Sequence, residues 1–249
     1  MATFLNHERP LLTVMLQCRG PETAIGRIRN ALHSGAEAFG LQVEALEPEY
    51  QTPEVIGKII RQMEGLPVYV TNYRSRYNKE KTDDQLAEEM LAIAECGATL
   101  CDVMGDMFCR HPDELTDDPA AVEKQIKYIE QLHAKGADVL MSSHTKKFLP
   151  AERVLEIGLE QQRRGADIAK IVTEADTMEQ QIENFRITNL LKENLDIELL
   201  HLSGGVSKIH RRIGGMLGNC MSLCVYEHDA LSTKLQPLLC NMKHIRDLF

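Results

Sequence analysis

Short apolar runs alternate with longer amphipathic segments along the whole chain. The short runs are dense in Val, Leu, Ile and Met and lack the strict polar alternation of half-exposed strands, which is typical of strands buried on both faces of a sheet. The longer segments carry apolar residues every three or four positions, as Val122, Ile126, Ile129 and Leu132 do, which predicts helices with one buried face. The predicted strands cover residues 13–18, 39–44, 68–73, 100–104, 139–144, 168–172, 197–202 and 220–226.

Local signals mark where the predicted helices begin and end. Pro21 suits a first helical position, and Thr82 with Gln85 forms a capping-box pattern. Gly35, Gly97 and Gly165 follow the last periodic residue of three of these segments, where helices commonly end. The predicted helices cover residues 21–33, 52–63, 82–97, 119–136, 150–164, 177–194 and 207–217, with a last one from residue 237.

One helix after each strand predicts a parallel sheet with right-handed crossovers. Eight such units in 249 residues match the size of a (β/α)8 TIM barrel, so we predict α/β architecture with one domain over residues 1–249. The alternative is an open doubly wound sheet. Gly-x-Gly-x-x-Gly does not follow the first strand, and Gly214, Gly215 and Gly218 fall on or after a helix, which disfavours a phosphate-binding loop there.

Composition narrows the possible partners. Apolar residues make up 43% and charged residues 26%, with a net charge of -9, which indicates a globular protein and disfavours nucleic acid or an anionic membrane as partners. The chain lacks a long apolar run and a signal-peptide pattern, and its seven cysteines favour free thiols over a disulfide framework or a zinc site. We therefore expect a cytoplasmic protein.

Lys170 is the most informative single residue, because it lies inside the apolar run 168–172. A charged amine is costly in a buried strand, so such a lysine loses its proton or finds a partner. An uncharged amine can form a Schiff base with a ketone or aldehyde. The alternative is a lysine at a strand end whose amine reaches water or pairs with an acid.

The carboxyl ends of barrel strands are where TIM-barrel chemistry gathers. His144 ends the strand before that of Lys170, so neighbouring strands would bring an imidazole, which exchanges protons near neutral pH, close to the amine. On its own this histidine fits a structural role, and Lys170 on the next strand favours the catalytic one. Arg212 has a guanidinium suited to a substrate carboxylate, although a solvated helix arginine is the alternative. The other polar residues at strand ends or in the following loops include Arg19, Gln42, Glu44, Arg74, Glu80, Ser232 and Gln236.

At these residues the chain resembles type I 3-dehydroquinate dehydratase, the Schiff-base enzyme of the shikimate pathway. The likeness is carried by residues 139–144 with Pro150 beyond, by residues 165–171, and by residues 70–75. The resemblance implies a (β/α)8 barrel, often dimeric, that needs no metal or cofactor. It implies that Lys170 forms the imine and His144 is the catalytic histidine. It further implies that Arg212 binds the substrate carboxylate, Ser232 and Gln236 lie on a loop over the substrate, Arg74 lines the site, and Glu80 stands for an acidic loop residue.

The second predicted strand departs from the family pattern. The family has a Glu-x-Arg pair there, and this chain has Gln42 and Glu44. The loss of one arginine weakens an anion site by about 1–3 kcal/mol per charged hydrogen bond, and Arg19 after the first strand could restore a positive charge. We expect a lyase that dehydrates 3-dehydroquinate to 3-dehydroshikimate. Two alternatives are an aldolase-like or dehydratase enzyme that uses the same imine on another hydroxy-keto acid, and a non-catalytic barrel that binds a metabolite or partner.

Overall fold

The computed structural model describes residues 2–205 and 208–248, and eight parallel strands form the wall of a barrel in this part of the chain. Seven consecutive pairs are hydrogen-bonded, and the order is β7-β6-β5-β4-β3-β2-β1-β8. A parallel bridge from Leu199 to Asn219, next to the start of β8, brings the two ends of the sheet together. The predicted TIM barrel is therefore confirmed. The strands are β1 (Leu11–Leu16), β2 (Ala38–Gln42), β3 (Val68–Thr71), β4 (Leu100–Met104), β5 (Asp138–His144), β6 (Ile168–Thr173), β7 (Glu198–Ser203) and β8 (Met221–Cys224).

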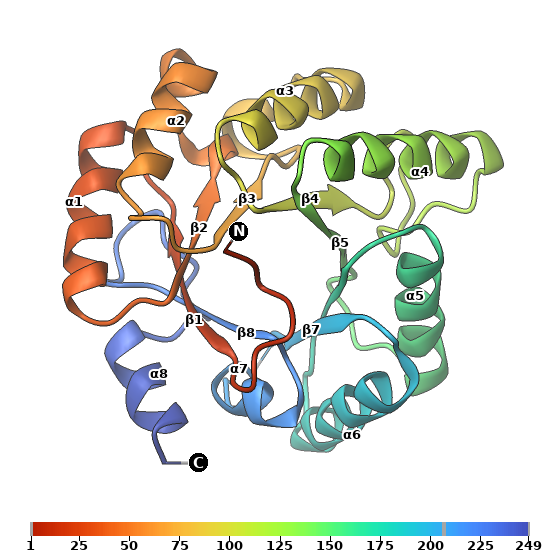
Figure 1. Ribbon diagram of the computed structural model, residues 1–249. Coiled ribbons are helices and arrows are strands. Elements are labelled where there is room, and N and C mark those ends of the chain that lie inside the picture. Colours follow the sequence, from red (N-terminus) through yellow and green to blue (C-terminus); the bar gives the residue numbers. More distant parts are fainter. Residues whose placement is uncertain (1, 206–207, 249) are drawn as a thin grey trace.

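A ring of helices surrounds the strands (Figure 1). Most predicted helix boundaries lie within two residues of the observed ones, because the caps read from the sequence form: Thr82 and Gln85 make a complete capping box, and the Thr52 and Thr177 side chains accept from the first turn of their helices. The helices are α1 (Pro21–His33), α2 (Pro53–Arg61), α3 (Asp83–Glu95), α4 (Pro119–Ala134), α5 (Ala151–Arg163), α6 (Met178–Asn194), α7 (His210–Ile213) and α8 (Leu239–Arg246).

Several strands differ from the predicted bounds by up to two residues, as β1, β3 and β8 do, and two further segments differ in a way that affects the site. The second strand stops at Gln42, and Glu44 lies in a 3-10 turn (Val43–Ala45) rather than on the strand. The predicted helix 207–217 is a single α-helical turn, α7, followed by a 3-10 turn (Gly214–Leu217), and its predicted start at Ser207 lies outside the described residues. Glycines at 214, 215 and 218 lower helix propensity, which explains the short and irregular helix.

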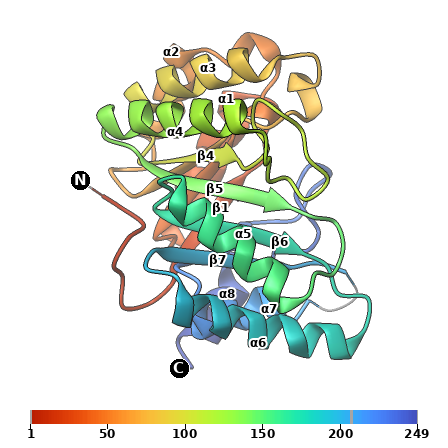
Figure 2. The ribbon, with the colours of Figure 1, turned by 90° about the vertical axis from the view of Figure 1, so that its right-hand side faces the viewer.

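Apolar side chains fill two separate layers. An inner cluster inside the barrel includes Met15, Leu100, Leu140 and Ile168, while a larger cluster packs the outer face of the strands against the helices. Phe4 is fully buried and belongs to the inner cluster. Figure 2 shows the N-terminal segment at the end of the barrel opposite the arrowheads of β4 and β5. The inner layer is therefore closed at the amino end, and the carboxyl ends of the strands remain for a site.

In the described residues, every helix is too short or too polar to cross a bilayer.

Candidate active site

Lys170 points into the barrel from the middle of β6. It pairs with Ser142 of β5 in the register of the sheet, and only 5% of its side chain is exposed. Its Nζ donates to the hydroxyls of Tyr69 at 2.8 Å and Tyr73 at 2.7 Å, and lies 3.2 Å from Oδ2 of Asp102. A buried lysine either loses its proton or finds a partner, and in this structure Lys170 has an acidic partner, Asp102.

Asp102 of β4 is the centre of this cluster. Its Oδ2 accepts hydrogen bonds from Tyr69 and Tyr73 in addition to Lys170, and its Oδ1 accepts from Ser142 at 2.5 Å. The side chain is fully buried, and a buried carboxylate is tolerated only when such donors surround it. Burial and the Asp102 charge raise the pKa of Tyr69 and of Tyr73 well above the usual value, so both tyrosines stay protonated and serve as donors.

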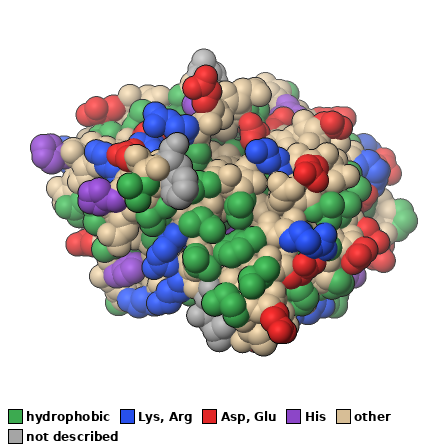
Figure 3. All heavy atoms as spheres, turned by 90° about the horizontal axis from the view of Figure 1, so that it is seen from below, with side chains coloured by type: hydrophobic (Ala, Val, Ile, Leu, Met, Phe, Trp, Pro, Cys, Tyr) green, Lys and Arg blue, Asp and Glu red, His purple; other side chains and the backbone are tan. Residues whose placement is uncertain are grey.

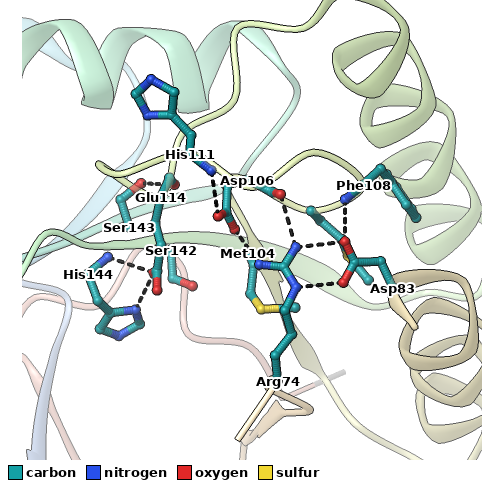
Figure 4. A network of polar contacts seen from close by, with 12 residues as sticks. Arg74, Asp83, Met104, Asp106, Phe108, His111, Glu114, Ser142, Ser143 and His144 are labelled. Atoms are coloured by element: carbon teal, nitrogen blue, oxygen red, sulfur yellow. Dashed lines mark hydrogen bonds and ion pairs between the residues drawn. The ribbon is translucent and has the colours of Figure 1, made fainter. Parts of the chain in front are cut away.

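His144 ends β5 and is held by Glu114, which lies in the loop between β4 and α4. One oxygen of Glu114 lies 2.8 Å from Nδ1 of His144 and accepts from its main-chain N–H at 2.8 Å (Figure 4). Burial acts to raise the pKa of Glu114, but the hydrogen bonds and charge of His144 outweigh it and the pKa is lowered. Because an ionised Glu114 can only accept, Nδ1 carries the proton, and Nε2 is the nitrogen that can take up a proton.

Tyr73 connects these two groups. Its hydroxyl contacts Lys170, and its ring meets the imidazole of His144 edge-on with centroids 5.4 Å apart. His144 lies opposite Val172 in the sheet register, two residues from Lys170 and on the same face of the paired strands. Lys170 and His144 were predicted to lie close together, and in the structure Tyr73 contacts both of them.

A cleft of 820 Å³ opens above this cluster. Its lining residues come from the carboxyl ends of β4 to β6, from the segments that follow β3 to β7, and from Leu235 in the segment after β8, and they include Tyr73 and His144. Arg74 also lines the cleft, but it is already neutralised: it donates twice to Asp83 of α3, and to the side chain and carbonyl of Asp106 (Figure 4). Two carboxylates around one guanidinium leave Arg74 little capacity for a substrate anion.

Arg211 is more buried than Arg110, the other cleft-lining arginine without an ion pair in the described residues. It lines the cleft, its Nε donates to the carbonyl of Ser203 at 3.1 Å, and within residues 2–205 and 208–248 it forms no ion pair. Desolvation lowers the pKa of Arg211 to about 10, which leaves it charged at neutral pH. A desolvated cation without a carboxylate partner is a suitable binding group for one.

The remaining predicted site residues lie in different places. Arg212 donates to the carbonyl of Lys208 and is not among the described cleft-lining residues, in contrast to Arg211 beside it. Arg19 and Glu80 are exposed and do not line the described part of the cleft either. Gln42 is half-buried at the end of β2.

Glu44 is buried, and both of its carboxylate oxygens accept from the hydroxyl of Thr71. Burial raises its pKa to about 7. Glu44 is not among the described residues that line the cleft.

Ser232 and Gln236 lie on the segment between β8 and α8 whose Leu235 lines the cleft. Ser232 closes a turn with Asp229, whose main-chain N–H donates to the serine hydroxyl at 2.9 Å. Gln236 is buried, and its Oε1 has no hydrogen-bond partner in the described part of the chain. An unpaired buried oxygen is a group that a ligand could satisfy.

Sequence reasoning did not single out Tyr69, Tyr73, Glu114 and Arg211 as site residues. Tyr69, Thr71 and Tyr73 have the two-residue spacing that places side chains on one face of a strand, and the polar face of this buried strand was a usable signal. The sequence contains no comparable signal for Glu114, because the path of the loop after β4, and not a periodic pattern, brings it to His144.

The chain is similar to known proteins in sequence and in fold. The model of the family described as type I 3-dehydroquinase matches residues 12–248. A 3-dehydroquinate dehydratase of Geobacillus thermodenitrificans (strain NG80-2) is 28% identical over 120 residues, which are 47% of this chain and 47% of the relative. The matched region thus spans about half the length of that relative.

Solved structures show the same fold. A type I 3-dehydroquinate dehydratase from Clostridium difficile, described with covalently modified comenic acid, has a TM-score of 0.82 at 18% identity, with 97% of this chain and 93% of that chain covered. The 3-dehydroquinate dehydratase from Geobacillus kaustophilus HTA426 has a TM-score of 0.81 at 15% identity, with 100% and 95% covered.

Proposed function

This chain belongs to the type I 3-dehydroquinase family, and from this premise we propose that it is a hydro-lyase that converts 3-dehydroquinate to 3-dehydroshikimate. The observation that carries the proposal is the placement of a buried lysine amine and a Glu-supported imidazole at the base of one cleft, joined by Tyr73.

The proposed reaction starts at Lys170. Its deprotonated amine attacks the ring ketone, and the loss of water gives an iminium whose positive nitrogen makes the adjacent carbon acidic. Nε2 of His144 removes the proton from that carbon. The same nitrogen, now protonated, delivers its proton to the β-hydroxyl, which leaves as water. Hydrolysis of the iminium then releases the enone and restores the lysine.

The substrate carboxylate is assigned to Arg211 rather than to Arg212, because only Arg211 lines the described cleft. Ser232 and Gln236 remain the proposed lid residues, and the unpaired Oε1 of Gln236 supports this role. Arg74 is proposed to orient the loops through Asp83 and Asp106. Arg19, Gln42 and Glu80 have no assigned contact with substrate in this proposal.

The experiment is a dehydration assay that follows formation of the conjugated enone. Lys170→Ala should reduce turnover of 3-dehydroquinate to the limit of detection, because the imine cannot form. Lys146→Ala is the matched control, since Lys146 is a lysine in the lining of the same cleft and should retain most turnover. Near-normal turnover by the Lys170 variant would refute the imine mechanism.

A second candidate function keeps the imine and changes the substrate to another hydroxy-keto acid, in an aldolase-like or dehydratase reaction. The observation that favours it is that two positions are poorly suited to bind an anionic substrate. Glu44 is a buried acid in the 3-10 turn after β2, and Arg74 is already neutralised by two carboxylates. A panel of hydroxy-keto acids, compared with 3-dehydroquinate by kcat/KM, separates the two functions.

We further propose that the protein is a cytoplasmic homodimer that binds neither nucleic acid nor membrane. Free thiols at all seven cysteines support a reducing compartment. Acidic and basic side chains are interspersed on the face in Figure 3, with hydrophobic side chains gathered near its middle, and Met178 and Ile182 of α6 are each 60% exposed. Light scattering on the purified protein measures the oligomeric state directly.

A further inference from the structure

The two tyrosines beside Lys170 make the same hydroxyl contacts but occupy different places. Each hydroxyl accepts from Nζ of Lys170 and donates to Oδ2 of Asp102. Tyr69 lies on β3 inside the barrel with none of its surface exposed. Tyr73 lies beyond the end of β3 and lines the cleft, and Lys170 is not among the described cleft-lining residues. Tyr73 thus contacts the amine and lines the cleft, whereas Tyr69 contacts the amine from inside the barrel.

Imine formation requires two proton movements at this point. The ammonium of Lys170 must lose a proton before the nitrogen can attack a carbonyl carbon. Attack and the transfer of one proton from nitrogen to oxygen within the adduct give the carbinolamine. The carbinolamine must then receive a proton from the protein on its hydroxyl, so that the C–O bond breaks and water leaves as the C=N bond forms. Asp102 is the base in contact with the amine, at 3.2 Å, but it is fully buried and has no direct position in the cleft.

We propose that Tyr73 is a catalytic proton relay between Asp102 and the oxygen that leaves during imine formation, an inference that rests on the proposed function. Asp102 takes the proton from Lys170 and becomes a carboxylic acid. When the carbinolamine collapses, Tyr73 gives its own proton to the departing hydroxyl and receives the proton of Asp102 in the same step. Asp102 returns to the carboxylate, Tyr73 returns to the phenol, and one water molecule is released.

The contacts of Tyr73 fit a relay better than a simple acid. Burial and the Asp102 charge raise the pKa of Tyr73 well above its usual value, so a step that left a tyrosinate behind would be costly, whereas a relay keeps the phenol neutral throughout. His144 has a separate task, because Glu114 fixes Nδ1 and leaves Nε2 for the substrate carbon. The ring of Tyr73 meets the ring of His144 edge-on, and this contact limits the movement of the tyrosine side chain.

The experiment compares Tyr73→Phe with Tyr69→Phe, a pair in which each variant deletes one hydroxyl bonded to Lys170 and Asp102. The rate of imine formation with 3-dehydroquinate is measured by rapid mixing and borohydride quenching, followed by the mass of the intact protein. Tyr73→Phe should slow imine formation by about 10²-fold, the usual size of a lost general acid. Tyr69→Phe should slow it by no more than about tenfold, near the low end for a hydrogen bond to a charged group, because its hydroxyl supports Lys170 and Asp102 but does not line the described cleft.

Two further measurements separate a relay from a purely structural tyrosine. Small carboxylic acids added as buffers should restore part of the rate in Tyr73→Phe and none in Tyr69→Phe, because they can donate the missing proton from the cleft. Imine formation by the unaltered protein should be slower in D2O than in H2O, a measurement that needs no variant to fold. Equal rates for the two variants, absence of buffer rescue, or equal rates in both solvents would each overturn the relay.

The outcome also distinguishes the relay from the proposed function. If the unaltered protein traps no ligand with borohydride, the imine mechanism fails and the relay fails with it. If the unaltered protein traps 3-dehydroquinate normally and the two tyrosine variants behave alike, the proposed function stands and only the relay is wrong.

Discussion

The two sides of the cleft are built in opposite ways. On the β3–β6 side, the polar groups around Lys170 are matched within the protein: Tyr69, Tyr73 and Ser142 all donate to Asp102, and His144 is paired with Glu114. On the β7–β8 side, Arg211 lines the cleft and forms no ion pair within the described residues, and Oε1 of Gln236 on the neighbouring segment has no hydrogen-bond partner there. Preformed networks suit chemistry, because they need no rearrangement at the moment of reaction, while unmatched polar groups suit binding. In the proposed function, the β3–β6 side therefore reacts and the β7–β8 side binds the substrate.

The largest expected effect on this division comes from the reacting side. His144→Ala should lower turnover by about 10²- to 10⁴-fold, the usual contribution of a general acid–base group, while Lys170 still forms a borohydride-trapped adduct. Glu114→Gln should cost less, about 10-fold, because it removes one charged hydrogen bond and leaves the imidazole in place. Steady-state kinetics with trapping on the same samples checks both. Unchanged turnover in Glu114→Gln would show that the loop carboxylate does not support the histidine.

Substitutions on the β7–β8 side should raise KM. They should leave the amount of borohydride-trapped adduct at saturating substrate unchanged. Arg211→Ala should raise KM by about 10- to 100-fold, since it removes charged hydrogen bonds to the substrate carboxylate. Arg212→Ala is the matched neighbour, and its guanidinium contacts the carbonyl of Lys208, so KM should change by no more than about twofold. Measured KM values that rank the two variants in the opposite order would return the carboxylate to Arg212.

The smallest expected effect concerns His210, the residue before Arg211, and is measured as a change in the free energy of unfolding. His210 precedes Arg211 and is buried against Thr188, whose hydroxyl lies 2.8 Å from its Nε2, with the ring stacked on Phe185. Burial, with the Arg211 charge added, lowers the pKa of His210 from 6.5 to about 4. Between these pH values the unfolded chain binds a proton that the folded protein does not, so the free energy of unfolding falls as the pH drops, by roughly 3 kcal/mol at most.

His210→Phe should make this pH dependence shallower between pH 6.5 and pH 4, the interval set by the lowered pKa of His210. Urea unfolding at several pH values measures the slope. His33→Phe is the control, because the side chain of His33 is exposed at the end of α1 and remains in water on folding. A slope that is the same in both variants and the unaltered protein would contradict the buried neutral state of His210.

Much of the fold could be predicted from the sequence, because its determinants are local. Periodicity gave each strand and helix, and Pro21, Thr82 and Gln85 mark boundaries through backbone geometry and capping that act within one turn. The position of Lys170 inside an apolar strand and of His144 at the end of the preceding strand similarly depends on the two-residue period and on strand order alone.

The site details could not be predicted in the same way, because they depend on rotation and on loop paths. Arg211 and Arg212 are adjacent on a single helical turn, where one residue step turns the side chain by about 100°. The sequence alone does not tell which of the two arginines faces the cleft. The buried position of His210 fixes the rotation of the turn, so that Arg211 lines the cleft. Glu114 reaches His144 from a loop that the buried Arg164 holds through the carbonyls of Gly105 and Thr116. That brace joins residues far apart in sequence, so no local pattern indicates it.

The most direct test of the central claim is the mass of the peptide that contains Lys170 after the protein is mixed with 3-dehydroquinate and reduced with borohydride. The account predicts an added mass equal to the reduced ligand adduct on Lys170 and on no other lysine, with Lys146 as the internal comparison in the same cleft. An unmodified Lys170 under conditions in which the protein consumes substrate would contradict the account.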